Sequence, residues 1–141
     1  KAINYSKKIA MSLSDLFCVE RHKKNFLDLV KNKLDIVFAN EQEISSLIDA
    51  KSFDEIISFS KEIKKEIVIT RGEKGAISIY DNQVIECDAQ KNLNIKDLTG
   101  AGDLFAAGYL HGMINKFDYK DRLTKGTELS SKVIQKIGGR I

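Results

Sequence analysis

The sequence comprises 141 residues, of which 43% are hydrophobic and 30% charged, enough for one soluble globular domain, or part of one, with a hydrophobic core. Lys and Arg number 23 against 20 Asp and Glu, and the basic residues are scattered rather than gathered on one stripe, so nucleic acid is not an expected partner. No apolar run approaches the roughly 20 residues of a membrane span, and no signal-peptide pattern is present, so we expect no membrane partner and a cytoplasmic protein.

Short apolar runs alternate with amphipathic stretches, a pattern typical of an α/β fold with a mostly parallel sheet. The chain begins at Lys1 within a helical pattern, "KAINYSKK", and we expect this start to be a cut in a longer chain. Strands are predicted over residues 9–13, 35–39 and 66–70, and an antiparallel hairpin over 76–80 and 84–88. Helices are predicted over 19–32, from 41 onward, and over 53–63, 102–116 and 124–136, with a loop over 117–122.

Two further positions carry predictions of local structure. Cys18 and Cys87 are far apart in the sequence and have no CxxC or histidine partner at metal-binding spacing. We therefore expect buried or half-buried free thiols and no zinc site. Gly138, in "IGGRI", would suit the C-cap of the last helix.

The first motif with chemical content is "DLTGAGDLFAAGYLHG", from Asp97 to Gly112. Gly100 and Gly102 lack a Cβ and allow a ligand close to the backbone, and the helix that starts there offers unpaired N–H groups to an anion. Asp103, in the first turn, could take a proton from a hydroxyl that attacks phosphorus. The alternative for this motif is purely structural: a tight glycine turn, with an acid that stabilises the helix dipole.

Two further motifs each follow a predicted strand. In "ANEQEI", Asn40 and Glu43 could hold water around Mg²⁺, or could simply be a helix cap and a solvated acid. In "VITRGEKGA", Thr70 with the two glycines offers a hydroxyl and backbone N–H groups, and Arg71 and Lys74 add positive charge. An ordinary glycine-bearing strand connection is the alternative for this third motif. A Walker P-loop and a dinucleotide-binding fingerprint both fail, because neither spacing is present.

Together and in this order, the three motifs resemble the C-terminal half of the ribokinase-like (pfkB-type) sugar and nucleoside kinase family. "DLTGAGDLFAAGYL" resembles that family's second signature, "NEQE" its N-x-x-E magnesium motif, and "TRGEKGA" its T-x-G-x-x-G nucleotide loop. The stretch from "SLSDLFCVERHKK" to "DIVFANEQEI" is also similar to bacterial members described as adenosine-kinase-like. The resemblance implies a three-layer α/β/α fold, here a partial domain with a mostly parallel sheet and an antiparallel hairpin.

The resemblance also implies roles for residues. Asp103 would be the catalytic base, and Gly100, Ala101 and Gly102 would form the anion hole for the transferring phosphoryl group. By the same resemblance, Asn40 and Glu43 would serve Mg²⁺ and the phosphates. The ATP phosphates and ribose would be lined by Thr70, Arg71, Gly72 and Gly75, and the adenine would lie near Thr127 and Ser131. Asp97 and Thr99 would bind a monovalent cation such as K⁺.

The chain departs from the family pattern in two places and lacks its first half. Leu98 replaces the usual Thr or Ser, and Arg71 stands where smaller or apolar residues are frequent. The glycine-rich substrate signature and the lid of the family's N-terminal half are absent. We therefore expect residues 1–141 to be the C-terminal ATP-binding and catalytic portion of a kinase, inactive alone, and prone to homo-oligomerise through an uncovered sheet edge.

The resulting hypothesis is ATP-dependent phosphoryl transfer to a hydroxymethyl group of a sugar or nucleoside of the ribose, fructose or adenosine type. A nucleotide-binding regulatory module without turnover is the first alternative, although pure binding has no need of a base at Asp103. An interaction domain without a ligand is the second alternative, and it predicts no stabilisation by ATP and Mg²⁺.

Overall fold

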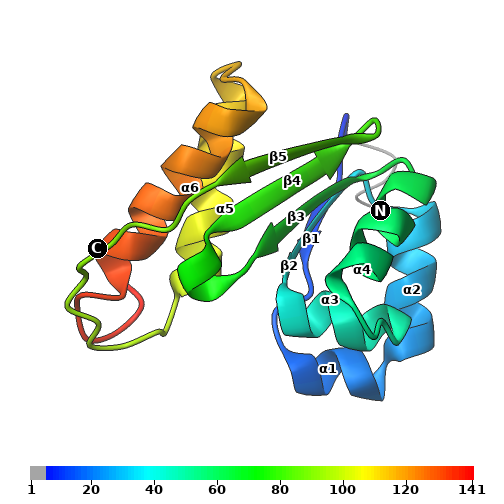
Figure 1. Ribbon diagram of the computed structural model, residues 1–141, viewed down its shortest axis with the longest axis horizontal. Coiled ribbons are helices and arrows are strands. Elements are labelled where there is room, and N and C mark those ends of the chain that lie inside the picture. The colour runs from blue at the N-terminus through cyan, green and yellow to red at the C-terminus, as the bar shows by residue number, and fades with distance from the viewer. Residues whose placement is uncertain (1–5) are drawn as a thin grey trace. The chain divides into compact units, whose positions relative to one another are not determined.

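The computed structural model describes residues 6–141, which form two compact units (Figure 1). The first unit contains the described residues up to Thr70 together with Ser78–Val84. The second contains Arg71–Ile77 and Ile85–Ile141. Among the described residues, no helix combines the length and apolar character that crossing a bilayer requires.

The described residues contain a five-stranded sheet in the order β1-β2-β3-β4-β5. β1 (Ala10–Ser12) pairs in parallel with β2 (Ile36–Asn40), which pairs in parallel with β3 (Glu66–Thr70). The first four residues of both β2 and β3 are buried, as expected for runs rich in Ile and Val in a parallel sheet. The register places Asn40 opposite Thr70, so two predicted site residues lie side by side at the carboxyl ends of neighbouring strands.

β4 (Ala76–Tyr80) and β5 (Gln83–Cys87) form the predicted hairpin. Only Asp81 and Asn82 connect them, and both have positive φ, 48° and 65°. A two-residue connection of this kind joins antiparallel strands, so the sheet is mixed. The α/β fold class with a mostly parallel sheet and an antiparallel hairpin is confirmed.

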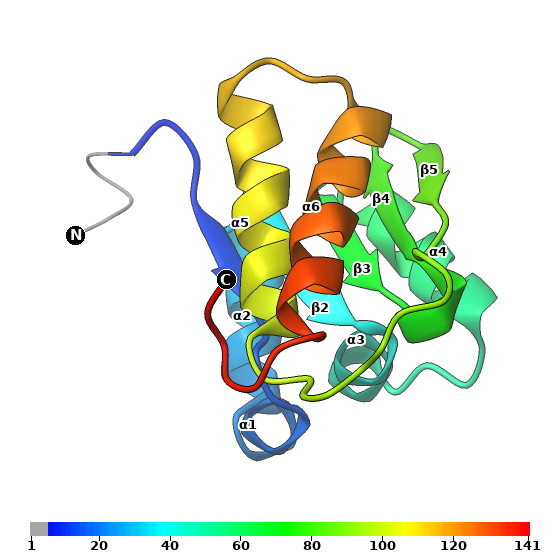
Figure 2. The same cartoon turned by 90° about the vertical axis from the view of Figure 1, so that its left-hand side faces the viewer.

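Helices α2 (Lys23–Asn32), α3 (Glu41–Ile48) and α4 (Phe53–Glu62) lie on one face of β1–β3 within the first unit (Figures 1 and 2). The single helix predicted over 19–32 is wrong: α1 (Leu16–Arg21) ends at His22, whose φ of −121° and ψ of 24° are not helical. α1 also begins earlier than predicted, because the Asp15 carboxylate accepts the first-turn amides of Phe17 and Cys18.

In the second unit, α5 (Ala101–Ile114) and α6 (Tyr119–Val133) lie side by side (Figures 1 and 2). Their backbones approach closely where Gly108 meets Gly126, because a Cβ on Gly108 would lie 2.9 Å from the Gly126 Cα. The small residues Gly108 and Gly126 therefore allow the two helices to pack closely.

Four local predictions need correction or fall outside the description. The loop predicted over 117–122 is wrong, because Asp118 accepts the Asp121 amide and starts α6 at Tyr119. α6 ends before the Gly138 turn, so Gly138 is not its C-cap. Cys87 is buried as predicted, but Cys18 is exposed on α1. The N-terminal helix was predicted partly over residues 1–5, outside the described residues, and residues 6–8 are not helical.

Candidate active site

The start of α5 is an open helix N-terminus. Its N-cap is Gly100, which has a left-handed φ of 79° and provides no side-chain cap. The Ala101 amide donates to the Leu98 carbonyl (3.1 Å), and the Leu104 amide donates to the Gly100 carbonyl (2.9 Å). Within residues 6–141, no hydrogen bond is recorded for the amides of Gly102 and Asp103. These two donors, at the positive end of the helix dipole, are available to an anion.

Asp103 is exposed in the first turn of α5, and Gly102 beside it is exposed too. A Cβ on Gly102 would meet nothing within 4 Å, so the space in front of this turn is open. The turn thus combines free amide donors with an accessible carboxylate. That is the pair of groups that phosphoryl transfer requires, a donor set for the phosphoryl oxygens and an acceptor for the hydroxyl proton.

Asp97 and Thr99 lie in the loop before α5. The Asp97 carboxylate accepts the backbone amides of Thr99 and Gly138, both at 2.9 Å. The hydrogen bonds from Thr99 lower the pKa of this carboxyl, and the amide of Gly138 lowers it further. Each carboxylate oxygen therefore accepts one N–H group, and the suggested K⁺ site remains a prediction.

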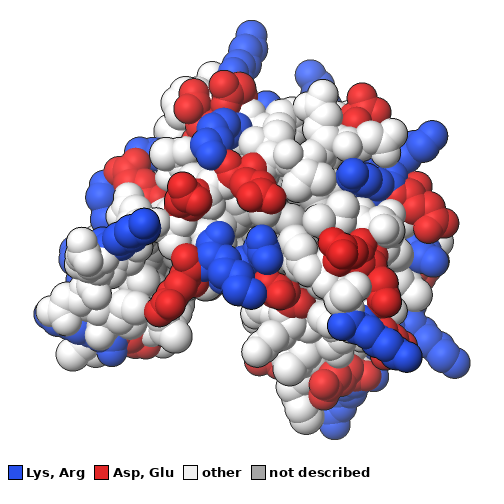
Figure 3. Space-filling model, in the orientation of Figure 1, with Lys and Arg blue, Asp and Glu red and all other residues white. Residues whose placement is uncertain are grey.

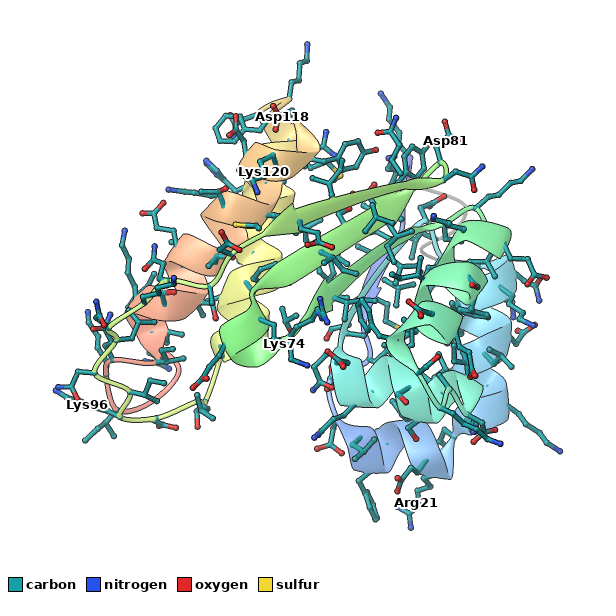
Figure 4. All side chains as sticks on the ribbon, viewed as in Figure 1. Arg21, Lys74, Asp81, Lys96, Asp118 and Lys120 are labelled. Carbon is teal, nitrogen blue, oxygen red and sulfur yellow. The ribbon has the colours of Figure 1, made fainter. Side chains whose placement is uncertain are left out.

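The proposed nucleotide loop belongs to the second unit apart from Thr70. Gly72–Lys74 forms a short 3₁₀ turn, labelled η2 here, with Lys74 on its surface (Figure 4), and the Arg71 amide donates to the Gly75 carbonyl (2.8 Å). Gly75 is obligatory, because its φ is 86° and a Cβ there would lie 2.0 Å from the Cys87 carbonyl oxygen. The loop is therefore held tightly against the end of β5.

Cys87 connects this loop to α6. Its Sγ lies 3.6 Å from the Thr124 hydroxyl and 3.9 Å from that of Thr127. The structure thus brings Gly75 and Thr127 to the same neighbourhood through Cys87, as a nucleotide site formed from both would need. Ser131, one turn after Thr127 on α6, is buried. Its role near the adenine therefore stays a prediction without an exposed side chain to support it.

In the first unit, Asn40 and Glu43 form a reciprocal capping box at the start of α3. The Asn40 Oδ1 accepts the Glu43 amide (2.8 Å), while Glu43 accepts the backbone amide and the side-chain Nδ2 of Asn40 (2.9 and 2.8 Å). Glu43 is only 6% exposed. Thr70, beside Asn40 at the end of β3, is half-buried.

The charge around Glu43 bears on the predicted Mg²⁺ site. Burial raises the pKa of Glu43, the hydrogen bond from Asn40 opposes this, and the negative charge of Asp15 raises it again. No group of three His, Cys, Asp or Glu in the described part of the chain could enclose a metal. The donors still fit Mg²⁺, which takes few protein ligands and keeps waters and phosphate oxygens, since excess negative charge at Glu43 and Asp15 favours a cation.

Sequence reasoning missed three contributors to these sites. Asp15 was not connected with Glu43, although it ends the loop after β1 as Asn40 ends β2. Gly138 was predicted as a helix C-cap and Gly139 was given no role, yet a Cβ on Gly100 would lie 2.9 Å from the Gly139 Cα. A glycine pair after the last periodic segment was the available signal.

On the face shown in Figure 3, acidic and basic side chains are interspersed, as the scattered charges predicted.

Comparison with known proteins gives a consistent result. Residues 4–141 match the family described as pfkB family carbohydrate kinase. A cytidine kinase from Thermococcus kodakarensis is 34% identical over 121 residues, which cover 82% of this chain and 42% of that protein. The chain therefore spans about two-fifths of the length of this relative.

Solved structures show the same relationship. A probable sugar kinase from Rhizobium etli superposes with a TM-score of 0.92 at 37% identity, over 97% of this chain and 42% of the other. The adenosine kinase from Sinorhizobium meliloti superposes with a TM-score of 0.91 at 34% identity, over 95% and 41%. The open helix start, the glycine loop and the capped α3 all fall within residues 4–141, which match the family.

Proposed function

The chain belongs to the pfkB family of carbohydrate kinases, and from that premise we propose that it is the C-terminal, ATP-binding and catalytic portion of a longer kinase. The reaction is transfer of the γ-phosphoryl group of ATP to a hydroxymethyl group of a sugar or nucleoside. One observation carries the proposal: the uncapped start of α5, where two amides without a recorded partner in residues 6–141 adjoin the exposed Asp103.

In this proposal, Asp103 accepts the proton of the acceptor hydroxyl. At the same time, the hydroxyl oxygen forms a bond to the γ-phosphorus of ATP. The bond between that phosphorus and the β,γ-bridging oxygen breaks, and ADP leaves with the electron pair. The amides of Gly102 and Asp103 donate to the phosphoryl oxygens as their charge redistributes. Gly100 and Ala101 shape the turn, and the missing side chain at Gly102 leaves room for the phosphoryl group.

We assign the ATP phosphates and ribose to the loop at residues 70–75. Thr127 on α6 would lie beside the adenine. Arg71 and Lys74 supply positive charge for the phosphates. Glu43 and Asn40 would hold Mg²⁺ through water, and that ion would neutralise phosphate charge when bound. Because Glu43 is buried in its capping box, its contribution is indirect, through the orientation of Asn40 and the local negative charge.

The names of the relatives support a choice of acceptor to test. The matches at 34% identity are a cytidine kinase and an adenosine kinase, and a ribokinase from Lactococcus lactis matches at 25%. A nucleoside is thus the first acceptor to test, with ribose second. We propose a nucleoside hydroxymethyl group as the preferred phosphoryl acceptor.

The test is phosphorylation of cytidine, adenosine, ribose and fructose by the complete protein that carries this chain, with and without Asp103→Asn. We expect turnover with at least one acceptor and a decrease of about 10²–10⁴-fold in kcat in the variant. ATP affinity should be retained, because the asparagine leaves the amides of the turn in place.

Two results would overturn the proposal. Turnover that survives Asp103→Asn at the wild-type rate would remove Asp103 as the base. ATP binding without phosphorylation of any acceptor would instead favour the regulatory module, in which the same open turn binds phosphate and nothing is transferred.

A further inference from the structure

The end of β5 lies between the glycine loop and α6. On one side, a Cβ built on Gly75 would lie 2.0 Å from the carbonyl oxygen of Cys87 and 2.9 Å from the amide nitrogen of Ala89. On the other side, the ammonium group of Lys120, labelled on α6 in Figure 4, donates to the Glu86 carbonyl. This stretch of backbone therefore connects the two elements to which the proposed function assigns the nucleotide.

The Cys87 side chain makes three polar contacts in this connection. Cys87 is 8% exposed, and its thiol donates to the Asp88 carbonyl at 3.5 Å. The Thr127 hydroxyl donates to the same sulfur at 3.9 Å, and the Thr124 hydroxyl oxygen lies 3.6 Å from it. We call Cys87, Thr124 and Thr127 the thiol cluster. Each contact is individually weak, because a thiol is a weak donor and a weak acceptor.

The thiol cluster sets the direction of the Thr127 hydroxyl. A hydroxyl or a thiol has one proton to donate. Thr124 donates its proton to the Lys120 carbonyl at 2.9 Å, and Cys87 donates its own to the Asp88 carbonyl. The sulfur is thus left as an acceptor for the Thr127 proton. The Thr127 hydroxyl is therefore held in one orientation by a residue 40 positions away on another element.

From these contacts, and resting on the proposed function, we propose that Cys87 is a positioning residue for nucleotide binding. Its thiol fixes the Thr127 hydroxyl on α6, while its backbone supports the loop at Gly75. Cys87 touches neither substrate in this role. A site whose groups are already ordered loses less conformational freedom when the ligand binds, so the effect of Cys87 falls on ATP affinity rather than on the transfer of the phosphoryl group.

The alternative role for Cys87 is that of an ordinary core residue, since free cysteines are often buried as small apolar side chains. In that role, any side chain of similar volume would serve equally well. The recorded contacts of the sulfur are with a carbonyl and two hydroxyls, and these favour the positioning role. The two roles predict different outcomes for polar and apolar substitutions.

The first experiment compares Cys87→Val and Cys87→Ser with wild type in the complete kinase. The acceptor is whichever of cytidine, adenosine, ribose and fructose the wild type phosphorylates fastest. Valine has a similar volume but no polar group, and we expect it to raise the KM for ATP about three- to tenfold, as for loss of one hydrogen bond. The kcat and the KM for the acceptor should stay within about twofold. Serine, which keeps a donor and an acceptor, should restore most of the ATP affinity.

Ser60→Ala is the matched control for loss of a buried polar contact. Ser60 is 1% exposed on α4, and its hydroxyl donates to the Ile56 carbonyl at 2.7 Å. It has no part in the proposed nucleotide site, so the KM for ATP should stay within about twofold of wild type. A rise as large as that of Cys87→Val would attribute both effects to general destabilisation and would refute the positioning role.

A double-mutant cycle tests whether Cys87 acts through Thr127. Thr127→Val should raise the KM for ATP at least as much as Cys87→Val does. Adding Cys87→Val to Thr127→Val should change it by less than about twofold, because the hydroxyl that the thiol orients is already gone. Effects that multiply in the double variant would mean that the two side chains act independently, which contradicts the proposal.

These kinetics separate the present proposal from the proposed function. A wild-type KM for ATP in Cys87→Val, together with loss of turnover in Asp103→Asn, would overturn the role of Cys87 and leave the kinase assignment intact. An equal rise in KM for the serine and valine variants would also overturn it, because polarity at this position would then be irrelevant. Turnover retained in Asp103→Asn would instead refute the proposed function itself.

A second measurement uses the wild-type kinase and does not depend on a variant folding. Cys87 is buried, so iodoacetamide reaches its sulfur only when the end of β5 separates from α6. If ATP binds only the closed arrangement, Mg²⁺-ATP at ten times its Kd should slow alkylation of Cys87 about tenfold. Cys18, exposed on α1, reports the reactivity of the reagent in the same sample by peptide mass mapping. Equal alkylation of Cys87 with and without ATP would show that nucleotide binding is not coupled to the thiol cluster, and the proposal would fail.

Discussion

The starts of α3 and α5 treat the unpaired amides of a first helical turn in opposite ways. Both helices begin in polar, glycine- or asparagine-containing loops, and both have an acid in the first turn, Glu43 in α3 and Asp103 in α5. At α3, the acid folds back onto Asn40 and is buried, whereas Asn40 itself is exposed. At α5, the N-cap is a glycine and the acid remains exposed.

The difference shows how a helix start becomes available for chemistry. A side-chain cap stabilises a helix but occupies the amides that an anion would use. At α5 the N-cap Gly100 offers no such side chain, and its position is maintained instead by contact with Gly139. Stability is thus provided from behind the helix start, and the front stays open.

The largest expected effect on folding is that of Gly100→Ala. Alanine at a φ of 79° is strained, and its Cβ would lie 2.9 Å from the Gly139 Cα. We expect a loss of about 2–4 kcal/mol in the free energy of unfolding, from the left-handed backbone and from overpacking against another backbone. Urea denaturation of the two proteins measures the difference.

Gly102→Ala is the matched control for that substitution. Gly102 has no positive φ, and a Cβ there would meet nothing within 4 Å. We expect the free energy of unfolding of Gly102→Ala to exceed that of wild type by no more than about 1 kcal/mol. The direction is stabilising because alanine is the better helix residue. Equal losses for both glycine variants would show that Gly139 does not support the start of α5.

A smaller effect is expected from opening the other helix start with Asn40→Ala. The substitution removes the acceptor of the Glu43 amide and one donor to the Glu43 carboxylate. We expect a loss of about 1–2 kcal/mol in the free energy of unfolding, the usual cost of an N-cap with a buried partner. Asn40→Ser keeps a capping oxygen and should lose less. If serine costs as much as alanine, the cap is not what stabilises α3.

The sequence predicted the parallel strands and both helix starts, and the reason is local. β2 and β3 contain runs of buried Ile, Val, Phe and Ala at residues 36–39 and 67–69, and "GAGD" and "NEQE" place glycine, amide and acid at fixed offsets from a helix start. Chemistry of this kind depends on neighbours within a few residues. Such neighbours can be identified from the sequence alone.

Other features could not be predicted because they depend on distant partners or weak local signals. The break at His22 interrupts an apolar spacing that continues across it, and the start of α6 depends on Asp118, which no apolar period marks. The contact of Asp97 with Gly138 joins residues 41 apart. Periodicity contains no information on that pairing, so the support behind α5 emerged only from the structure.

The smallest expected effect concerns an acid that serves neither helix start. Glu128, within α6, accepts hydrogen bonds from Lys132 and Lys125, and these lower its pKa to about 2. A lowered pKa means that the unfolded chain binds more protons between about pH 4.5 and 2, so this contribution to stability is present above that window and is lost as the pH falls through it.

Glu128→Gln should therefore make the midpoint of thermal unfolding slightly less sensitive to acid over that window, with little change at neutral pH, because exposed ion pairs contribute little. Thermal scans at pH 2 to 7, in low and high salt, measure the effect, and high salt should reduce it. A loss at neutral pH as large as that of Asn40→Ala would contradict this ranking. It would mean that surface charge on α6, rather than the backbone hydrogen bonds and glycine contacts at the two helix starts, controls the stability of these helices.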